Sequence, residues 1–339
     1  MTTTTEAPST DLQSELVTIH RNISHGPGRY TTQPNGITVG DVAKAFDLLH
    51  VHSEPAYQQV LDANGVGFAP IEGRQLIAKD HGGRVLAIPG AKSYVIHQYD
   101  ESILGIAADV LQASDGQARI AAHGQRNYGG QAFVQVELAD PIVLADDSVH
   151  PFLFLSGSHD GSLRTTARLG ANRLICTNML AGVFKHWQKI VGVKHTTFSE
   201  KRLIEARTLV TDLTVAATSL KHDIQRLLDI EVTTAEFGRI AESLYPKPKD
   251  GEERGDRAAH TRWETRRDIL WDLWRNDPRV APWTGTGWGA LQAFNTYHQH
   301  EMPVRVDRTD RSIDRFVSGD VLKRDTKVVA AIDSVALAN

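Results

Sequence analysis

Residues 152–185 read FLFLSGSHDGSLRTTARLGANRLICTNMLAGVFK, and this stretch decides the fold. An apolar run at Phe152–Ser156 leads into the Asp-Gly pair at 160–161, and a second run follows at Leu163–Leu169. Asp-Gly between two runs of strand-forming residues is a strong hairpin signal. A third run of this kind lies at Arg173–Thr177. We therefore predict antiparallel strands joined by tight turns.

The same sequence pattern extends back to Gly65: short runs of Val, Ile, Phe and Leu are separated by Gly, Asp and Asn. This spacing indicates further strands of a largely antiparallel sheet. The additional predicted strands are Arg84–Ile88, Tyr94–Gln98, Ala118–His123 and Ala132–Leu138, and the predicted helix among them is Asp100–Leu111. Ahead of them, residues 39–63 predict a short helix that Pro55 interrupts.

After Thr177 the chain becomes helical, and residues 199–230 hold the clearest periodicity in it. Apolar residues recur there at alternating spacings of three and four, which is a heptad seam. The seam consists of Leu203, Ala206, Val210, Leu213, Ala217, Leu220, Ile224 and Leu227. A stripe of this kind has to be buried. We expect it to pack mainly within the chain, with a homo-oligomer left open.

Three shorter helices are predicted next, at Thr234–Tyr245, Arg257–Asn276 and Trp288–His300. The first follows a capping box, Thr233-x-x-Glu236. The predicted fold class is α+β: a mainly antiparallel β-sheet domain, then a helical region with one long heptad-patterned helix. The predicted boundaries are a flexible N-terminal tail at 1–20, the α+β sheet domain at 21–185, a helical region packed on the sheet at 186–304 and a charged C-terminal tail at 305–339.

Composition narrows the class of protein. The chain has 339 residues, of which 41% are hydrophobic and 23% charged, as in ordinary globular proteins. Its net charge of −4 excludes a polybasic protein that binds nucleic acid by bulk charge. A single cysteine, Cys176, excludes an intramolecular disulfide and indicates a reducing compartment. Because we recognise no signal peptide and no membrane-spanning stretch, we expect a cytoplasmic location and no membrane partner.

The charge is unevenly distributed along the chain. Residues 156–207 contain nine Lys and Arg against three acidic residues, although the chain as a whole is acidic. A polyanion-binding face needs such a segment. The residues expected to contact nucleic acid are Arg164, Arg168, Arg173, Lys185, Lys189 and Lys194. Period-two alternation places Arg164 and Arg168 on one strand face. The alternative is that these are ordinary solvated faces.

The turn Ser158-His159-Asp160-Gly161-Ser162 has two interpretations. His159 and Asp160 are weak catalytic candidates, because a histidine beside a carboxylate and hydroxyls is able to activate a nucleophile. Adjacent residues on a turn point apart, however, and an aspartate there commonly hydrogen-bonds its own turn. We favour the structural role, in which Asp160, Gly161 and Ser162 form the turn and Gly161 has a positive φ.

His298 and Glu301 lie three residues apart on a predicted helix and offer a pair of metal ligands. We recognise no third ligand in the sequence and therefore predict no metal. The chain also lacks a Gly-x-x-x-x-Gly-Lys-Ser/Thr loop, so we expect no nucleotide-driven motor and no cofactor.

Five of the six tryptophans lie between Trp263 and Trp288. Trp263, Trp271 and Trp274 fall on one face of the predicted helix. Packing in a core or an interface explains them best, and base stacking is the second interpretation.

The order of these motifs resembles one family. The SHDGS turn at 158–162 and the strand Arg-Leu-Ile-Cys-Thr-Asn at 173–178 resemble the signature of the phage/plasmid-like proteins that carry the domain of unknown function 932. The resemblance continues through 83–111, 124–138, 194–206 and 285–303. The family often opens with a Trp-His-Gly-Leu-Gly loop, of which only His25-Gly26-Pro27-Gly28 is left here. The resemblance implies a mobile-element protein of a bacterial host, but no reaction, so no catalytic residue is carried over.

We therefore expect a non-enzymatic protein of single-strand binding or annealing type, acting in replication or recombination. Two alternatives stay open. One is an enzyme centred on His159 and Asp160 or on His298 and Glu301. The other is an oligomerising structural or host-interaction protein built on the heptad helix.

Overall fold

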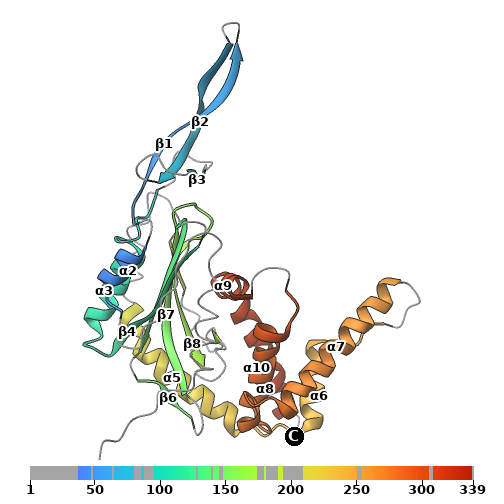
Figure 1. The fold of residues 1–339 in the computed structure, drawn as a ribbon. Helices are drawn as coiled ribbons and strands as arrows, with labels where there is room; N and C mark the ends of the chain where they lie inside the picture. The colour runs from blue at the N-terminus through green and yellow to red at the C-terminus, as the bar shows by residue number, and fades with distance from the viewer. Residues whose placement is uncertain are drawn as a thin grey trace, which may run out of the picture. The chain divides into compact units, whose positions relative to one another are not determined.

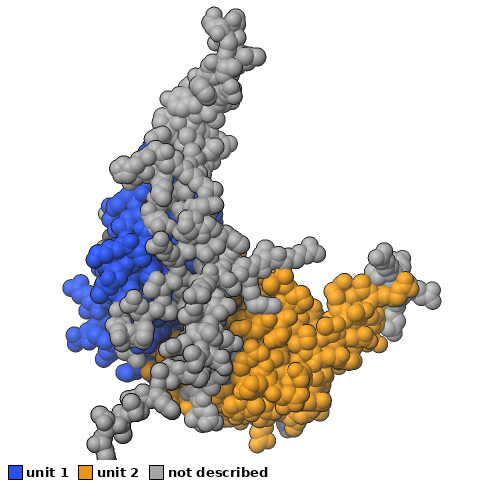
Figure 2. All heavy atoms as spheres, in the orientation of Figure 1, with its two compact units in different colours: residues 1–140, 152–168, 189–213 blue, residues 141–151, 169–188, 214–339 orange. Residues whose placement is uncertain are grey.

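A computed structural model describes residues 37–46, 49–62, 65–79, 85–87, 95–126, 129–138, 140–144, 148–173, 179–180, 190–193, 209–249, 254–304 and 308–337. The chain divides into two compact units, which Figure 2 colours separately. Unit 1 comprises residues 1–140, 152–168 and 189–213, and unit 2 comprises 141–151, 169–188 and 214–339. No helix in the described segments combines the length and the apolar character needed to cross a membrane.

Figure 1 shows the strands and helices along the chain. The strands are β1 (Val51–Asp62), β2 (Gly65–Lys79), β3 (Val85–Ala87), β4 (Ala118–Arg126), β5 (Gln131–Leu138), β6 (Ile142–Val143), β7 (Ser148–Ser158), β8 (Thr165–Arg173), β9 (Met179–Leu180) and β10 (Ile190–Val193). The helices are α2 (Val39–Ala45), α3 (Ile103–Ala113), α5 (Leu209–Asp229), α6 (Thr234–Leu244), α7 (Arg254–Asn276), α8 (Gly287–Thr296), α9 (Arg308–Ser318) and α10 (Asp320–Ala336). Two irregular helices, η2 (Ala281–Trp283) and η3 (Tyr297–Glu301), are 3-10 and π in type.

A seven-stranded sheet forms around the SHDGS hairpin. Its strand order is β10-β8-β7-β5-β4, with β6 beside β7 and β9 beside β8. The pairings β4–β5, β5–β7, β6–β7, β8–β9 and β8–β10 are all antiparallel. With the helices that follow, this sheet confirms the α+β class. The helix predicted at 100–111 is confirmed as α3, which packs on β4 and β5.

The strand predicted at Tyr94–Gln98 is wrong, because residues 95–98 have no regular secondary structure. The Gln98 side-chain amide binds both backbone groups of Val51, donating to its oxygen at 2.8 Å and accepting from its nitrogen at 3.0 Å. Side-chain hydrogen bonds therefore replace a strand ladder at this point.

The helix predicted for 39–63 is also wrong beyond Ala45. The helix α2 ends there, and β1 pairs with β2 in a long hairpin, from Val51 opposite Lys79 to Asp62 opposite Gly65. The pairing register shifts between Pro55 and Tyr57. Sheets accommodate proline at such irregularities, so Pro55 interrupts a strand pairing and not a helix.

The helix α5 confirms the C-terminal half of the heptad seam. Leu220, Ile224 and Leu227 are each 1% exposed or less. The buried stripe continues through Ala216 and not through Ala217, which is partly exposed. The seam from Leu203 to Leu213 stays a prediction, because those side chains lie outside the described residues.

The core of unit 2 is aromatic. The helix α6 begins at the predicted capping box, where Glu236 Oε2 accepts from the Thr233 N–H at 2.6 Å. Its Phe237 ring stacks on Trp274 with centroids 4.5 Å apart, and the Phe294 ring lies 5.6 Å away. The helix α10 packs against α6, α8 and α9.

The segment predicted as a charged tail with a weakly helical end, 305–339, is mostly helical and packed. The helices α9 and α10 occupy most of it and bury Ile313, Phe316, Val321 and Ile332, each 5% exposed or less. Between the helices stands Gly319, with φ +82°. Amphipathic helices bury one apolar stripe among many charges, so overall charge is a poor indicator of a tail.

Candidate nucleic-acid interface

Tryptophan and arginine alternate along one face of α7. Trp263, Arg267, Trp271 and Arg275 follow one another at intervals of four residues. Side chains four apart lie one above the other on a helix, so these four form a continuous row, called here the Trp–Arg row. The two tryptophans are about 12 Å apart along the helix axis, at a rise of about 1.5 Å per residue.

Each arginine of the Trp–Arg row lies over a ring. The guanidinium carbon of Arg267 is 5.0 Å from the Trp263 ring centroid, and that of Arg275 is 4.6 Å from the Trp271 centroid. Cation–π contacts of this kind hold a cation against an aromatic face. The row therefore presents positive charge and aromatic surface at regular intervals.

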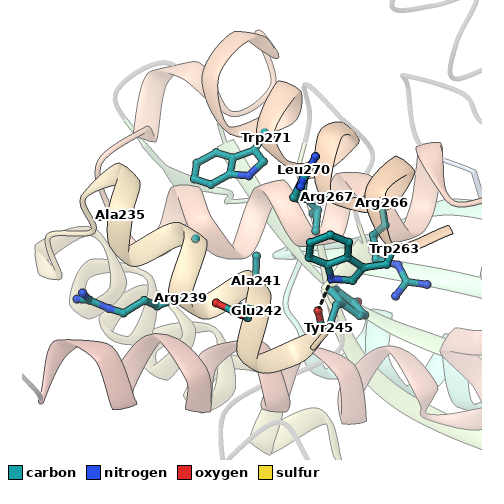
Figure 3. Close-up of a pocket in the computed structure, with 11 residues that line it drawn as sticks. Ala235, Arg239, Ala241, Glu242, Tyr245, Trp263, Arg266, Arg267, Leu270 and Trp271 are labelled. Atoms are coloured by element: carbon teal, nitrogen blue, oxygen red, sulfur yellow. Dashed lines mark hydrogen bonds between the residues drawn. The ribbon is translucent and has the colours of Figure 1, made fainter. Parts of the chain in front are cut away.

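Three members of the row, Trp263, Arg267 and Trp271, line a hollow of about 390 Å³ between α6 and α7, called here the α6–α7 groove (Figure 3). Its lining residues are Ala235, Gly238, Arg239, Ala241, Glu242, Tyr245, Trp263, Arg266, Arg267, Leu270 and Trp271. In Figure 3 the Trp271 ring lies toward one end of the groove, and Trp263 and Tyr245 lie toward the other.

Small residues on α6 create the space. Ala235, Gly238 and Ala241 recur every third residue on the side that lines the groove. A Cβ atom on Gly238 would lie 3.2 Å from Cζ2 of Trp271, tighter than ordinary van der Waals contact. The missing side chain at Gly238 therefore lets the Trp271 ring lie close against α6.

The Tyr245 end of the groove is held by polar contacts. Trp263 Nε1 donates to the Tyr245 carbonyl oxygen at 3.0 Å, and the Arg266 guanidinium lies 4.4 Å above the Tyr245 ring. Arg266 Nε also donates to the Tyr297 hydroxyl at 3.1 Å. Burial raises the pKa of Tyr245 to about 12, so its hydroxyl is protonated at neutral pH.

The groove is net basic, and its cations reach solvent. The helix α7 carries six arginines and four acidic residues. The Arg267 side chain is 45% exposed and pairs with Asp268 at 2.9 Å, and Arg239 is 59% exposed and pairs with Glu236 at 3.4 Å. The Arg267–Asp268 pair is exposed on both sides and therefore weak, so a phosphate competes for Arg267 at little cost. Glu242 is the acidic residue among the groove's lining residues.

A family model matches residues 90–318, about two thirds of the chain, and its description is a domain of unknown function, DUF932. The chain belongs to the DUF932 family. The DUF932 match confirms the resemblance noted at the SHDGS turn, and it contains the whole α6–α7 groove. No curated protein and no solved structure matches the chain.

The arginines predicted to contact nucleic acid in the sheet of this DUF932 protein are not equivalent. Arg164 is exposed and precedes β8, whereas Arg168 within β8 is 6% exposed. The shared exposed face was therefore a wrong prediction for Arg168, because Thr165, Thr166, Ala167 and Arg168 are all buried, on both faces of the strand. The side chains of Arg173, Lys185, Lys189 and Lys194 lie outside the described residues, so their role stays a prediction.

We expect Arg168→Ala and Arg164→Ala to differ in stability. Burial disfavours the charged form of Arg168 and lowers its pKa, and truncation removes a buried side chain from a central strand. Losses of about 1–3 kcal/mol in the free energy of unfolding are usual at such sites, whereas exposed positions change little. Urea unfolding of the two variants measures the difference. Equal, small losses would show that Arg168 is exposed.

The SHDGS turn has the structural role predicted for it. Asp160 Oδ1 accepts from the Ser162 N–H at 2.9 Å and from the Ser162 hydroxyl. Gly161 has φ +74°, as predicted. The His159 ring is fully buried and stacks on Tyr99, with centroids 3.6 Å apart. The turn residues and the histidine are thus held in different surroundings, which gives the catalytic interpretation no geometric support.

His298 and Glu301 also have separate partners. His298 Nε2 lies 2.6 Å from the Tyr245 hydroxyl, whereas Glu301 Oε1 accepts from Arg279 Nη2 at 3.3 Å. Among the described residues, no group of three or more His, Cys, Asp and Glu is placed to hold a metal. Their pairing as ligands or as a catalytic couple therefore finds no support.

The tryptophans divide between two roles. Trp274 is 1% exposed and belongs to the core, as predicted. Trp263 and Trp271 are half-buried and line the groove. The sequence contained a signal for this difference that we did not use, namely the arginines at the fourth position after each of these two rings. No sequence signal marked Tyr245 or Arg239.

Proposed function

We propose that this DUF932 protein binds single-stranded nucleic acid without sequence preference, in the replication or recombination of a mobile element in the bacterial cytoplasm. The observation that carries the proposal is the Trp–Arg row on the wall of the α6–α7 groove. Proteins that bind single strands combine a basic groove for the backbone with aromatic rings on which bases stack. The Trp–Arg row supplies arginines for the phosphates and tryptophan rings for the bases, in alternation along α7.

The chemistry favours a single strand over a duplex. Bases in a duplex are stacked on one another, and their faces are closed to a tryptophan ring. In a single strand those faces are open, and Trp263 and Trp271 offer two separate platforms. We assign the arginines of the groove to phosphate contacts, which carry no sequence information, so we expect little sequence preference.

The sheet supports an annealing variant of this function by analogy. An antiparallel sheet followed by a long helix suits proteins that pair complementary strands, although fold alone does not fix function. Exposed Arg164, which directly precedes β8, is the described residue at this sheet that we assign to phosphate contact.

Salt dependence tests the proposal. Each phosphate contact on a single strand contributes about 0.7 to the slope of log affinity against log salt. We therefore expect Arg267→Gln and Arg275→Gln each to lower the slope by about 0.7, measured by fluorescence anisotropy with a labelled oligo(dT). Arg262→Gln is the matched control, because Arg262 is exposed on α7 and belongs neither to the Trp–Arg row nor to the groove lining.

The wild-type protein should bind the single strand more tightly than a duplex of the same length. If the wild-type protein does not bind oligo(dT) at about 50 mM salt, the proposal is refuted. Equal slopes for all three variants and the wild type would place the phosphate contacts elsewhere.

A further inference from the structure

Behind the Tyr245 end of the groove, five elements bring basic and polar side chains together. Tyr245 follows α6, Arg266 is on α7, His298 is in η3, Arg315 is on α9 and Arg324 is on α10. These residues form the arginine cluster. All five lie in unit 2.

Direct contacts join the members of the cluster. The Tyr245 hydroxyl is 2.6 Å from His298 Nε2, and the Arg266 guanidinium lies over the Tyr245 ring. Arg315 Nη1 donates to the His298 carbonyl oxygen at 3.2 Å. Arg324 acts electrostatically on both Tyr245 and His298, so it lies within range of both. Tyr245 and Arg266 also line the groove, which makes them the link between the two sites.

The cluster holds an excess of positive charge. His298 is 7% exposed, and burial together with the charges of Arg324, Arg315 and Arg266 lowers its pKa to about 2. The carboxylates that act on Arg324 are Asp325 and Asp320, yet burial outweighs them, and the Arg324 pKa is lowered. Three guanidinium groups gathered around one buried, neutral histidine destabilise the folded state, because the charges repel one another and lose hydration. An anion bound among them offsets this cost.

Several buried donors and acceptors in the cluster lack a hydrogen bond. Within the described part of the chain, Nε and Nη2 of Arg324 and Nδ1 of His298 have no hydrogen-bond partner. Buried polar groups normally form hydrogen bonds, so these atoms are available to a ligand.

The backbone adds a separate indication. Tyr297–Glu301 form a π-helix, in which the Met302 N–H donates to the Tyr297 carbonyl at 2.7 Å. π-helical turns are rare and are found frequently at functional sites. Here the turn carries Tyr297 and His298 into contact with Arg266 and Tyr245.

We propose that the arginine cluster is a phosphate-binding site, which holds a phosphate group of the strand whose bases occupy the α6–α7 groove. The guanidinium fork matches phosphate oxygens, and the unsatisfied Arg324 donors supply the remaining bonds. The assignment of the phosphate to a strand rests on the proposed function, whereas the site itself rests on the cluster alone.

Inorganic phosphate is the first probe. A ligand that binds only the folded state raises its melting temperature, by roughly 3–5 °C at ten times the dissociation constant for a unit of this size. We expect this rise with phosphate, compared with sodium chloride at equal ionic strength. It should be lost in Arg324→Gln and in Arg315→Gln and kept in the control Arg262→Gln. If Arg324→Gln fails to fold, the loss or persistence of the rise in Arg315→Gln decides whether the cluster binds phosphate.

The second arm identifies the source of the phosphate. Arg324→Gln should weaken oligo(dT) binding about tenfold. A loss confined to 5′- or 3′-phosphorylated oligonucleotides assigns the site to a strand end, and an equal loss without terminal phosphate assigns it to the backbone. Both results support the proposal.

The phosphate site is refuted if phosphate raises the melting temperature no more than chloride does, or if the rise persists in Arg324→Gln. Either result leaves the proposed binding of oligo(dT) in the groove untouched. If phosphate stabilises the protein but no oligonucleotide binds, the cluster is a site for free phosphate and not for a strand. That result overturns its assignment to a strand together with the proposed function.

Discussion

Gly289→Ala should strongly destabilise unit 2. A Cβ atom on Gly289 would lie 2.0 Å from the carbonyl oxygen of Trp283 and 2.6 Å from its carbonyl carbon. Both atoms belong to the backbone, so no change of rotamer relieves the overlap. The segment η2 would have to move away from α8, and Trp283, which is 5% exposed, would lose its packing. We expect a loss of about 3 kcal/mol, at the upper end for overpacking.

The sign of this effect is what makes it informative. Glycine to alanine in an ordinary helix stabilises by about 0.5–1 kcal/mol. Gly40 in α2 is such a position, because the nearest atom to its Cβ would be Thr38 Oγ1 at 3.7 Å. Gly40→Ala is therefore the control. A loss of about 3 kcal/mol lowers the melting temperature by roughly 6–12 °C. Tryptophan fluorescence follows it, since all six tryptophans of the chain belong to this unit. An unchanged melting temperature in Gly289→Ala would contradict the close approach of η2 to α8.

Local signals in the sequence predicted local structure well. The Asp-Gly pair predicted the turn at Gly161, and Thr233-x-x-Glu236 predicted the start of α6, because a turn and a cap depend on neighbouring residues alone. The alternation of Arg164 and Arg168 failed as a guide to exposure. It assumes one solvated strand face, and β8 lies between two other strands with both faces buried.

The same reasoning explains what was missed in the candidate site. Spacing along α7 puts Trp263 and Trp271 on one face, but whether that face is core or groove depends on the small residues of α6 opposite. The arginine cluster draws on five elements from Tyr245 to Arg324. Only tertiary packing brings them together, and no spacing in the sequence indicates it.

Replacing both groove tryptophans should remove most of the affinity for a single strand. Base–aromatic stacking contributes about 1–3 kcal/mol per base. Loss of two platforms in Trp263→Ala/Trp271→Ala therefore weakens binding at least about thirtyfold, at 1.4 kcal/mol per factor of ten. Trp263→Phe/Trp271→Phe keeps an aromatic face at each position and should stay within a fewfold of the wild type. Near-ultraviolet circular dichroism of both variants controls for the loss of the Trp263–Tyr245 hydrogen bond.

The ratio of oligo(dT) dissociation constants between the alanine double variant and the wild type, at one fixed salt concentration, tests the central claim most directly. The α6–α7 groove as the binding surface predicts a ratio of about thirty or more, with the phenylalanine double variant close to one. A ratio near one for a folded alanine double variant would contradict it and place the single strand on another surface of the protein.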